Sequence, residues 1–153
     1  MTLVALACLA LVVSTTLLHY EALRLLTTIL PLLHMVPRAR LIVVLLATFA
    51  AHALEIVLYA GASYALVRFT SAGTLGPGGH PAWTTVLYFS AETYTSLGYG
   101  DILPQGALRA LSGVEALNGL LLIGWTASFT YVAMQQLWGA APDAARSNGA
   151  SDR

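Results

Sequence analysis

The chain has 153 residues, of which 58% are hydrophobic and only 9% charged, and its formal net charge is zero. Soluble globular domains carry about 25% charged residues, so this composition excludes an ordinary soluble domain and indicates a membrane protein of one domain. Because the chain has no excess of positive charge, nucleic acid is also excluded as an expected partner.

The amino-terminal part, residues 1–36, is predicted to be a transmembrane helix followed by an interfacial segment. A helix needs about 20 apolar residues to cross a bilayer. The run from Thr2 to about Leu33 meets this length, although His19, Glu21 and Arg24 interrupt it. No basic residue precedes the run, as one would in a secretory signal, so we expect this helix to be retained.

Residues 37–139 are predicted to hold two more long helices with a short one between them. The apolar stretches at 40–69 and 106–138 are both long enough to cross a bilayer. The helix expected at 82–94 is too short to cross, and such a segment is tolerated at membrane depth only where protein buries it or it lines water. It is therefore expected to be re-entrant beside a pore. The small polar tail, 140–153, is predicted to be disordered and cytoplasmic.

Arginine placement predicts the orientation of the chain. Arg38 and Arg40 lie between the first two long segments, and Arg146 follows the third. The positive-inside rule places these residues in the cytoplasm. We therefore expect a multi-pass protein of the cell membrane with its amino terminus outside and its carboxyl terminus inside.

A glycine-rich motif, Thr95-Ser-Leu-Gly-Tyr-Gly-Asp101, follows the short helix. Successive backbone carbonyls point at one axis only if right- and left-handed dihedrals alternate, and glycine adopts the left-handed ones at little cost, which explains Gly98 and Gly100. Rings of such carbonyls replace the hydration shell of K⁺ in selectivity filters. From Trp83 to Tyr131 the sequence resembles the pore domain of the potassium channel family.

The resemblance implies an all-α membrane protein with a potassium-channel-like pore domain. An outer helix, a re-entrant pore helix, a filter at 95–101 and an inner helix would form this domain, with the amino-terminal helix as an addition. One chain supplies one filter strand, so a homotetramer in a lipid bilayer is needed to surround the ion. The expected function is passive K⁺ conduction, with no enzyme activity, no cofactor besides the permeant ion and no soluble ligand domain.

The same resemblance assigns the ion-binding residues. The filter comprises Thr95, Ser96, Leu97, Gly98, Tyr99 and Gly100, and K⁺ is expected on the carbonyls of Ser96, Leu97, Gly98 and Tyr99. Serine and leucine stand at 96 and 97 where the family usually has threonine and valine. Both changes keep the carbonyls but lose the stiffness of a β-branched side chain.

Further residues are assigned to filter support and to the pore. Glu92 and Asp101 match a carboxylate pair that shares a proton behind the filter, since two close carboxylates do not both ionise easily; alternatively, each caps a chain end in water. Tyr88 and Phe89 either brace the filter or simply pack. The residues implied to line the cavity are Leu120, Ile123, Ala127 and Tyr131.

Five residues are candidates for gating. Gly119 and Gly124 either hinge the inner helix or allow close helix packing. His52 and Glu55 share a helix face, and intramembrane ionisable groups are frequently functional. These two either sense protons or hydrogen-bond to each other, the pore helix and the inner helix. Glu115 either tunes gating or is a buried partner of a polar group.

Three other functions are weighed against a potassium channel. A cation channel without K⁺ selectivity is an alternative because of residues 96 and 97, and a non-conducting accessory subunit is another. Gly98 to Asp101 also fits the GxGD pattern of intramembrane aspartyl proteases. Such an enzyme needs a second intramembrane aspartate, whereas Asp143 and Asp152 lie in the tail.

Overall fold

The computed structural model describes residues 1–32, 34–76 and 81–139, so the predicted tail lies outside the described residues. Helices dominate the described part, and none of its segments is a named strand, which confirms the all-α fold. The elements in chain order are α1 (Thr2–Ile29), the 3₁₀ helix η1 (Leu30–Leu32), α2 (Pro37–Phe69), α3 (Trp83–Tyr94) and α4 (Leu108–Gly139).

Three of these helices have the length and composition of membrane spans. The spans are Thr2–Leu32, Arg38–Phe69 and Leu108–Gln136. Helix α3, with 12 residues, is too short to cross. The chain is therefore a multi-pass membrane protein with one short helix between its second and third spans.

The starts of α2 and α4 differ from the predicted ones by two or three residues for local reasons, whereas the start of α3 and the end of α4 differ by one residue. Helix α2 begins at Pro37 instead of residue 40, because proline suits the first helical position, where no amide partner is needed. Helix α4 begins at Leu108 instead of residue 106. Gly106 has φ of 64°, a left-handed conformation that a right-handed helix does not contain.

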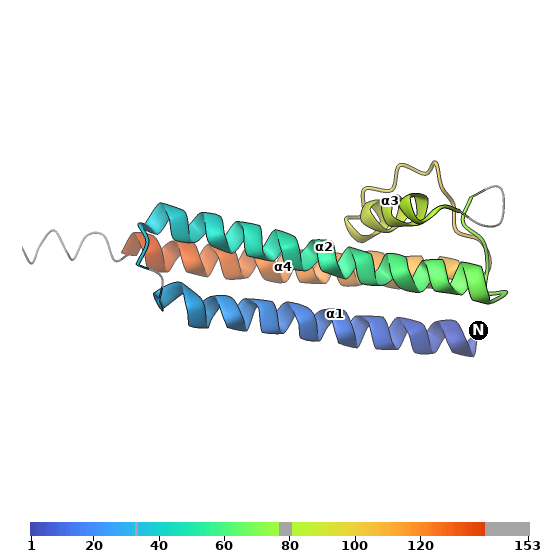
Figure 1. Cartoon of the computed structure of the whole chain (residues 1–153), viewed down its shortest axis with the longest axis horizontal. Helices are drawn as coiled ribbons and strands as arrows, with labels where there is room; N and C mark the ends of the chain where they lie inside the picture. Colours follow the sequence, from blue (N-terminus) through green and yellow to red (C-terminus); the bar gives the residue numbers. More distant parts are fainter. Residues whose placement is uncertain (33, 77–80, 140–153) are drawn as a thin grey trace, which may run out of the picture.

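The three long helices lie side by side, and α3 lies at one end of the bundle (Figure 1). Helix α1 packs along both α2 and α4, and α3 packs on the same two helices. The amino terminus lies at the same end of the bundle as α3, and the link between α1 and α2 lies at the other end. Helix α3 and the amino terminus therefore lie toward the same side of the membrane.

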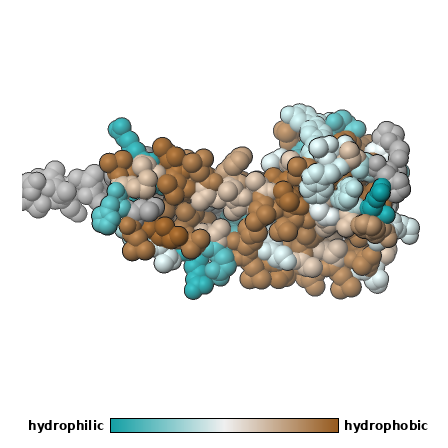
Figure 2. All heavy atoms as spheres, in the orientation of Figure 1, coloured by the Kyte–Doolittle hydropathy of each residue, from teal (hydrophilic) through white to brown (hydrophobic). Residues whose placement is uncertain are grey.

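The buried core lies where α3 meets the long helices. Tyr59 of α2, Val86 and Phe89 of α3, and Leu108 and Leu111 of α4 are buried together. Elsewhere the long helices expose apolar side chains, and Figure 2 shows hydrophobic residues over much of the visible bundle surface. Such a surface is suited to lipid or to neighbouring subunits, not to water.

The chain that follows the glycine-rich motif is hydrogen-bonded to the loop that follows α2. The amide of Gln105 donates to the carbonyl of Thr74 at 2.9 Å, and the amide of Ala107 donates to Ala72 at 2.8 Å. Leu75 and Pro104 form an isolated bridge in the same place. These backbone bonds fix the start of α4 relative to the end of α2.

Candidate functional site

The glycine-rich motif, residues 95–101, begins directly after the carboxyl end of α3. The amides of Leu97 and Gly98 both donate to the carbonyl of Glu92, at 2.9 and 3.2 Å. The amide of Ser96 donates to Thr93 at 3.0 Å. Carbonyls of the last turn of α3 thus accept hydrogen bonds from amides of the motif. The negative end of the α3 helix dipole lies at the start of the motif, where it favours a cation.

The backbone of the motif has left-handed dihedrals at alternate residues. Ser96, Gly98 and Gly100 have φ values of 58°, 53° and 79°. The two glycines follow the expectation from the sequence. Ser96 does not, because left-handed dihedrals cost a residue with a Cβ roughly 1–2 kcal/mol. A residue other than glycine, Ser96, therefore has a left-handed backbone conformation at the first position of this alternation.

Glu92 lies behind the motif and contacts it directly. Its side chain is 4% exposed, and its carboxylate accepts a hydrogen bond from the amide of Tyr99 at 3.1 Å. Within the described part of the chain no hydrogen bond joins Glu92 to Asp101, so the shared proton stays a prediction. Desolvation, together with the nearby carboxylates of Asp101 and Glu92, raises the pKa of Tyr88, whose side chain is exposed. Phe89 instead packs in the core.

Residues Thr95 to Gly100 are all exposed in the single chain. Leu97 is 58% exposed and Tyr99 is 68% exposed, which is high for large apolar and aromatic side chains in a membrane protein. The carbonyls of this stretch are the backbone groups available to hold an ion. One chain leaves both the back and the front of the stretch uncovered.

The inner-helix candidates lie on an exposed side of α4. The side chains predicted to line a cavity are all exposed in the single chain: Leu120, Ile123, Ala127 and Tyr131. The helix continues without interruption through both glycines. A Cβ at Gly119 would lie 2.1 Å from the carbonyl oxygen of Tyr94, whereas one at Gly124 would meet nothing within 4 Å. Close packing therefore requires glycine at 119 but not at 124.

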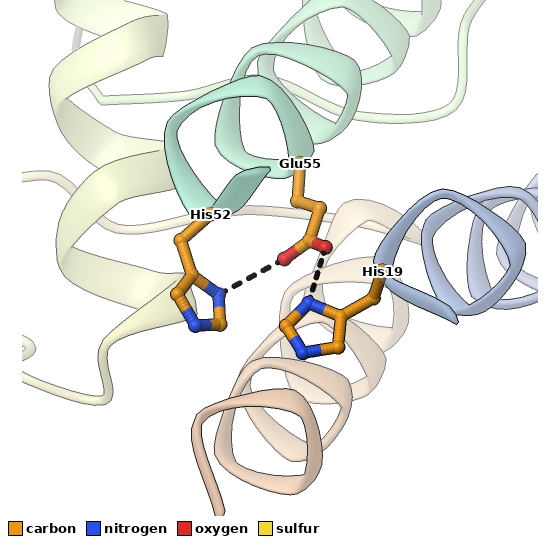
Figure 3. A group of neighbouring side chains, drawn as sticks. All are labelled: His19, His52 and Glu55. Atoms are coloured by element: carbon orange, nitrogen blue, oxygen red, sulfur yellow. Dashed lines mark hydrogen bonds and ion pairs between the residues drawn. The ribbon is translucent and has the colours of Figure 1, made fainter. Parts of the chain in front are cut away.

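A polar network links all four α-helices inside the bundle. His52 Nδ1 lies 3.0 Å from a carboxylate oxygen of Glu55, and both residues come from α2 (Figure 3). The hydroxyl of Tyr94, at the end of α3, donates to the same oxygen of Glu55. His52 Nε2 lies 2.9 Å from the hydroxyl oxygen of Thr126 in α4.

His19 of α1 joins this network, although the sequence marked it only as an interruption of an apolar run. Its Nδ1 lies 3.0 Å from the other oxygen of Glu55, and its Nε2 lies 3.1 Å from the hydroxyl oxygen of Thr126. The side chain is fully buried. Its position as an ionisable group in a membrane span is the signal that could have identified it.

A second polar layer lies nearer the amino-terminal end of α1. The amide of Asn118 in α4 donates to the hydroxyls of Thr15 in α1 and Tyr59 in α2, at 2.7 and 3.1 Å. Glu115 is fully buried one helical turn away, and Ser90 of α3 donates to it. Glu115 is thus a buried hydrogen-bond partner of α3.

The described residues contain a single aspartate, Asp101, and so do not themselves provide the aspartate pair that an aspartyl protease needs. Asp101 is exposed at the end of the motif. The other two aspartates lie in the tail, outside the described residues.

Comparison with known families agrees with this architecture. The family model described as "Ion channel" matches residues 41–136, more than half of the chain. The matched part begins in α2 and ends in α4, and so contains the short helix and the glycine-rich motif. No curated protein and no solved structure matches the chain at a significant level. The chain belongs to the ion channel family, as a subunit whose pore-forming region is preceded by an additional transmembrane helix.

Proposed function

We propose that four copies of this chain form a potassium-selective channel. The observation that carries the proposal is the alternation of left-handed dihedrals at Ser96, Gly98 and Gly100. This alternation is what a stack of inward-pointing carbonyls requires, and carbonyl oxygens replace the hydration shell of K⁺. The ligands in this proposal are the carbonyls of residues 96–99, with the Ser96 hydroxyl at the inner end.

The exposed surfaces of the single chain support a tetramer. The side chains of Leu97 and Tyr99 are more than half exposed, although their own backbone carbonyls are among the proposed ion ligands. Leu120 and Tyr131 of α4 are 53% and 61% exposed. In a four-fold assembly, neighbouring chains cover the back of each filter strand, and the four inner helices enclose a water-filled cavity.

A second candidate is a cation channel without K⁺ selectivity. It is favoured by Ser96 and Leu97, which lack the β-branches that stiffen side chains beside a filter. A filter that flexes more discriminates less well if selectivity depends on cavity size. The two candidates share the same pore and differ only in the ratio of K⁺ to Na⁺ flux.

Cation flux from liposomes that contain the purified protein tests the proposal. We expect flux driven by a K⁺ gradient to exceed flux driven by a Na⁺ gradient. Gly98→Ala should abolish both, because alanine disfavours the φ of 53° found at this position. Equal K⁺ and Na⁺ fluxes would favour the non-selective channel, and no flux from an intact wild-type tetramer would favour an accessory subunit.

A further inference from the structure

A cluster of metal-binding side chain types lies outside the proposed filter, in the interior of the helix bundle. His19 of α1 and His52 and Glu55 of α2 each offer a ligand atom, and these atoms lie within 4.8 Å of one another. His19 and Glu55 are fully buried, and the His52 side chain is 16% exposed. Figure 3 shows both imidazoles directing Nδ1 at the Glu55 carboxylate from opposite sides. Imidazole nitrogen and carboxylate oxygen are ligands that Zn²⁺ and related divalent ions take.

When both imidazoles are neutral and Glu55 is ionised, this cluster has too few hydrogens to form all of its hydrogen bonds. A neutral imidazole has one N–H donor and one acceptor nitrogen. If both hydrogens lie on Nδ1, facing Glu55, then both Nε2 atoms need a hydrogen from Thr126, whose hydroxyl has only one. If one hydrogen moves to Nε2, that imidazole directs a bare Nδ1 at the carboxylate. The contacts among His19, His52, Glu55 and Thr126 can therefore all be satisfied only if one further positive charge is present, either a proton or a metal ion.

A divalent metal ion between the two Nδ1 atoms and Glu55 removes this conflict. Each imidazole then keeps its hydrogen on Nε2 and donates it to Thr126, whose oxygen has two acceptor lone pairs. A ligating histidine usually donates its second N–H to such an outer partner, which fixes the tautomer and the ring orientation. The Thr126 hydroxyl oxygen would accept the Nε2 hydrogen bonds of both histidines in this way.

Tyr94 distinguishes a metal ion from a single extra proton. Its hydroxyl lies 2.9 Å from His52 Nδ1 and also donates to Glu55, whose same oxygen lies 3.0 Å from His52 Nδ1. Three polar atoms are thus in mutual contact, although the imidazole N–H and the phenol supply only two hydrogens for three contacts. Ligands bound at 2.0–2.2 Å in a tetrahedral shell lie roughly 3.4 Å apart. The ligand atoms of His19, His52 and Glu55 already lie within 4.8 Å of one another, so adjustments of these side chains and of Tyr94 would bring the cluster to this spacing.

We propose that His19, His52 and Glu55 bind one divalent ion of the Zn²⁺ type in each subunit, with the Tyr94 hydroxyl as the fourth ligand. The ion would join α1 to α2 and to the last residue of α3, after which the filter motif begins. The additional amino-terminal helix would thereby be fastened to the pore-helix end. This inference does not depend on the ion that the filter conducts.

Metal content of the purified full-length protein tests the site. After stripping with a chelator, incubation with Zn²⁺ and removal of free metal, we expect one Zn²⁺ per subunit. His52→Gln and Glu55→Gln should each reduce binding at least tenfold. His34→Gln is the matched control, because His34 is an exposed histidine in the link between α1 and α2. In the wild type, Zn²⁺ should raise the melting temperature and the chelator should reverse the rise, which keeps the test informative if a variant fails to fold.

Co²⁺ substitution reports the ligands themselves. The visible absorption of bound Co²⁺ should change on Tyr94→Phe and stay the same on Tyr64→Phe, a tyrosine that packs against Trp83 instead. Absence of stoichiometric metal in the folded wild type would overturn the proposal, as would binding that survives both the His52 and Glu55 substitutions. A ¹⁵N-histidine spectrum that shows one imidazolium and is unchanged by Zn²⁺ would overturn it too, because a proton would then occupy the place of the metal.

Discussion

The backbone amide of Tyr99 donates a hydrogen bond to the buried carboxylate of Glu92, 3.1 Å away. The carbonyl of the same glutamate accepts from the amides of Leu97 and Gly98. One residue of α3 therefore holds the filter motif through both its backbone and its side chain. Because the motif is exposed in the single chain and packs little against the rest of it, these bonds are its principal support within the subunit.

Glu92→Val should impair the filter much more than Glu92→Gln. Valine leaves the Tyr99 amide without its acceptor, and the loss of a hydrogen bond costs about 0.5–1.5 kcal/mol, whereas glutamine keeps a carbonyl oxygen there. We expect the valine variant to lose K⁺ flux in liposomes or to lose discrimination against Na⁺. Wild-type flux and selectivity in the valine variant would show that this bond does not hold the filter.

Gly119→Ala should destabilise the protein, and Gly124→Ala should not. The new Cβ at 119 would lie 2.1 Å from the carbonyl oxygen of Tyr94, which is backbone and does not move aside easily. Overpacking of this kind costs about 1–3 kcal/mol, occasionally more. At 124 the Cβ meets nothing within 4 Å, so alanine should be neutral or slightly stabilising as a better helix former. Thermal melting of the purified protein measures both, and equal effects would contradict a packing role specific to Gly119.

Asn118 and Thr15 should be energetically coupled across α4 and α1. The amide of Asn118 donates to the Thr15 hydroxyl at 2.7 Å. Hydrogen bonds between membrane helices average about 0.6 kcal/mol in double-mutant cycles. A cycle of Asn118→Ala and Thr15→Val, followed by unfolding in mixed micelles, should give a coupling of this size.

Thr48 supplies the control for that cycle. It is also a buried threonine of a long helix, but its hydroxyl donates within its own helix, to the carbonyl of Val44. Thr48→Val combined with Asn118→Ala should therefore be additive. If the free-energy changes of Asn118→Ala and Thr15→Val were additive as well, the Asn118–Thr15 hydrogen bond would not stabilise the packing of α1 on α4.

Ile123 and Leu122 should differ in their access to water. Ile123 is 37% exposed in the subunit and is expected to face the cavity, whereas its neighbour Leu122 is 3% exposed. In a background of Cys8→Ala, which removes the single native thiol, Ile123→Cys should allow a charged thiol reagent to block flux. Leu122→Cys should be unaffected, and block at both positions would contradict the proposed orientation of α4.

The sequence by itself determined the features that depend on local chemistry. The length of each apolar run fixed which segments cross the membrane, since a bilayer has a defined thickness. The glycines of the motif predicted the left-handed dihedrals at 98 and 100, because side chains oppose that conformation. The sequence also predicted that the short helix at 82–94 does not cross the membrane, because its length is well below the thickness of a bilayer.

Only the tertiary structure decided which residues meet between helices. His19 contacts Glu55 across 36 positions, and Gly119 packs against the carbonyl of Tyr94. The left-handed Ser96 was not expected either, since its dihedral depends on how α3 holds the motif. The physical reason is that membrane helices are apolar on all sides, so the periodicity that reveals the buried face of a soluble helix is absent. Rotation and register are then set by packing and by a few polar contacts between helices, which become visible only once the helices are side by side.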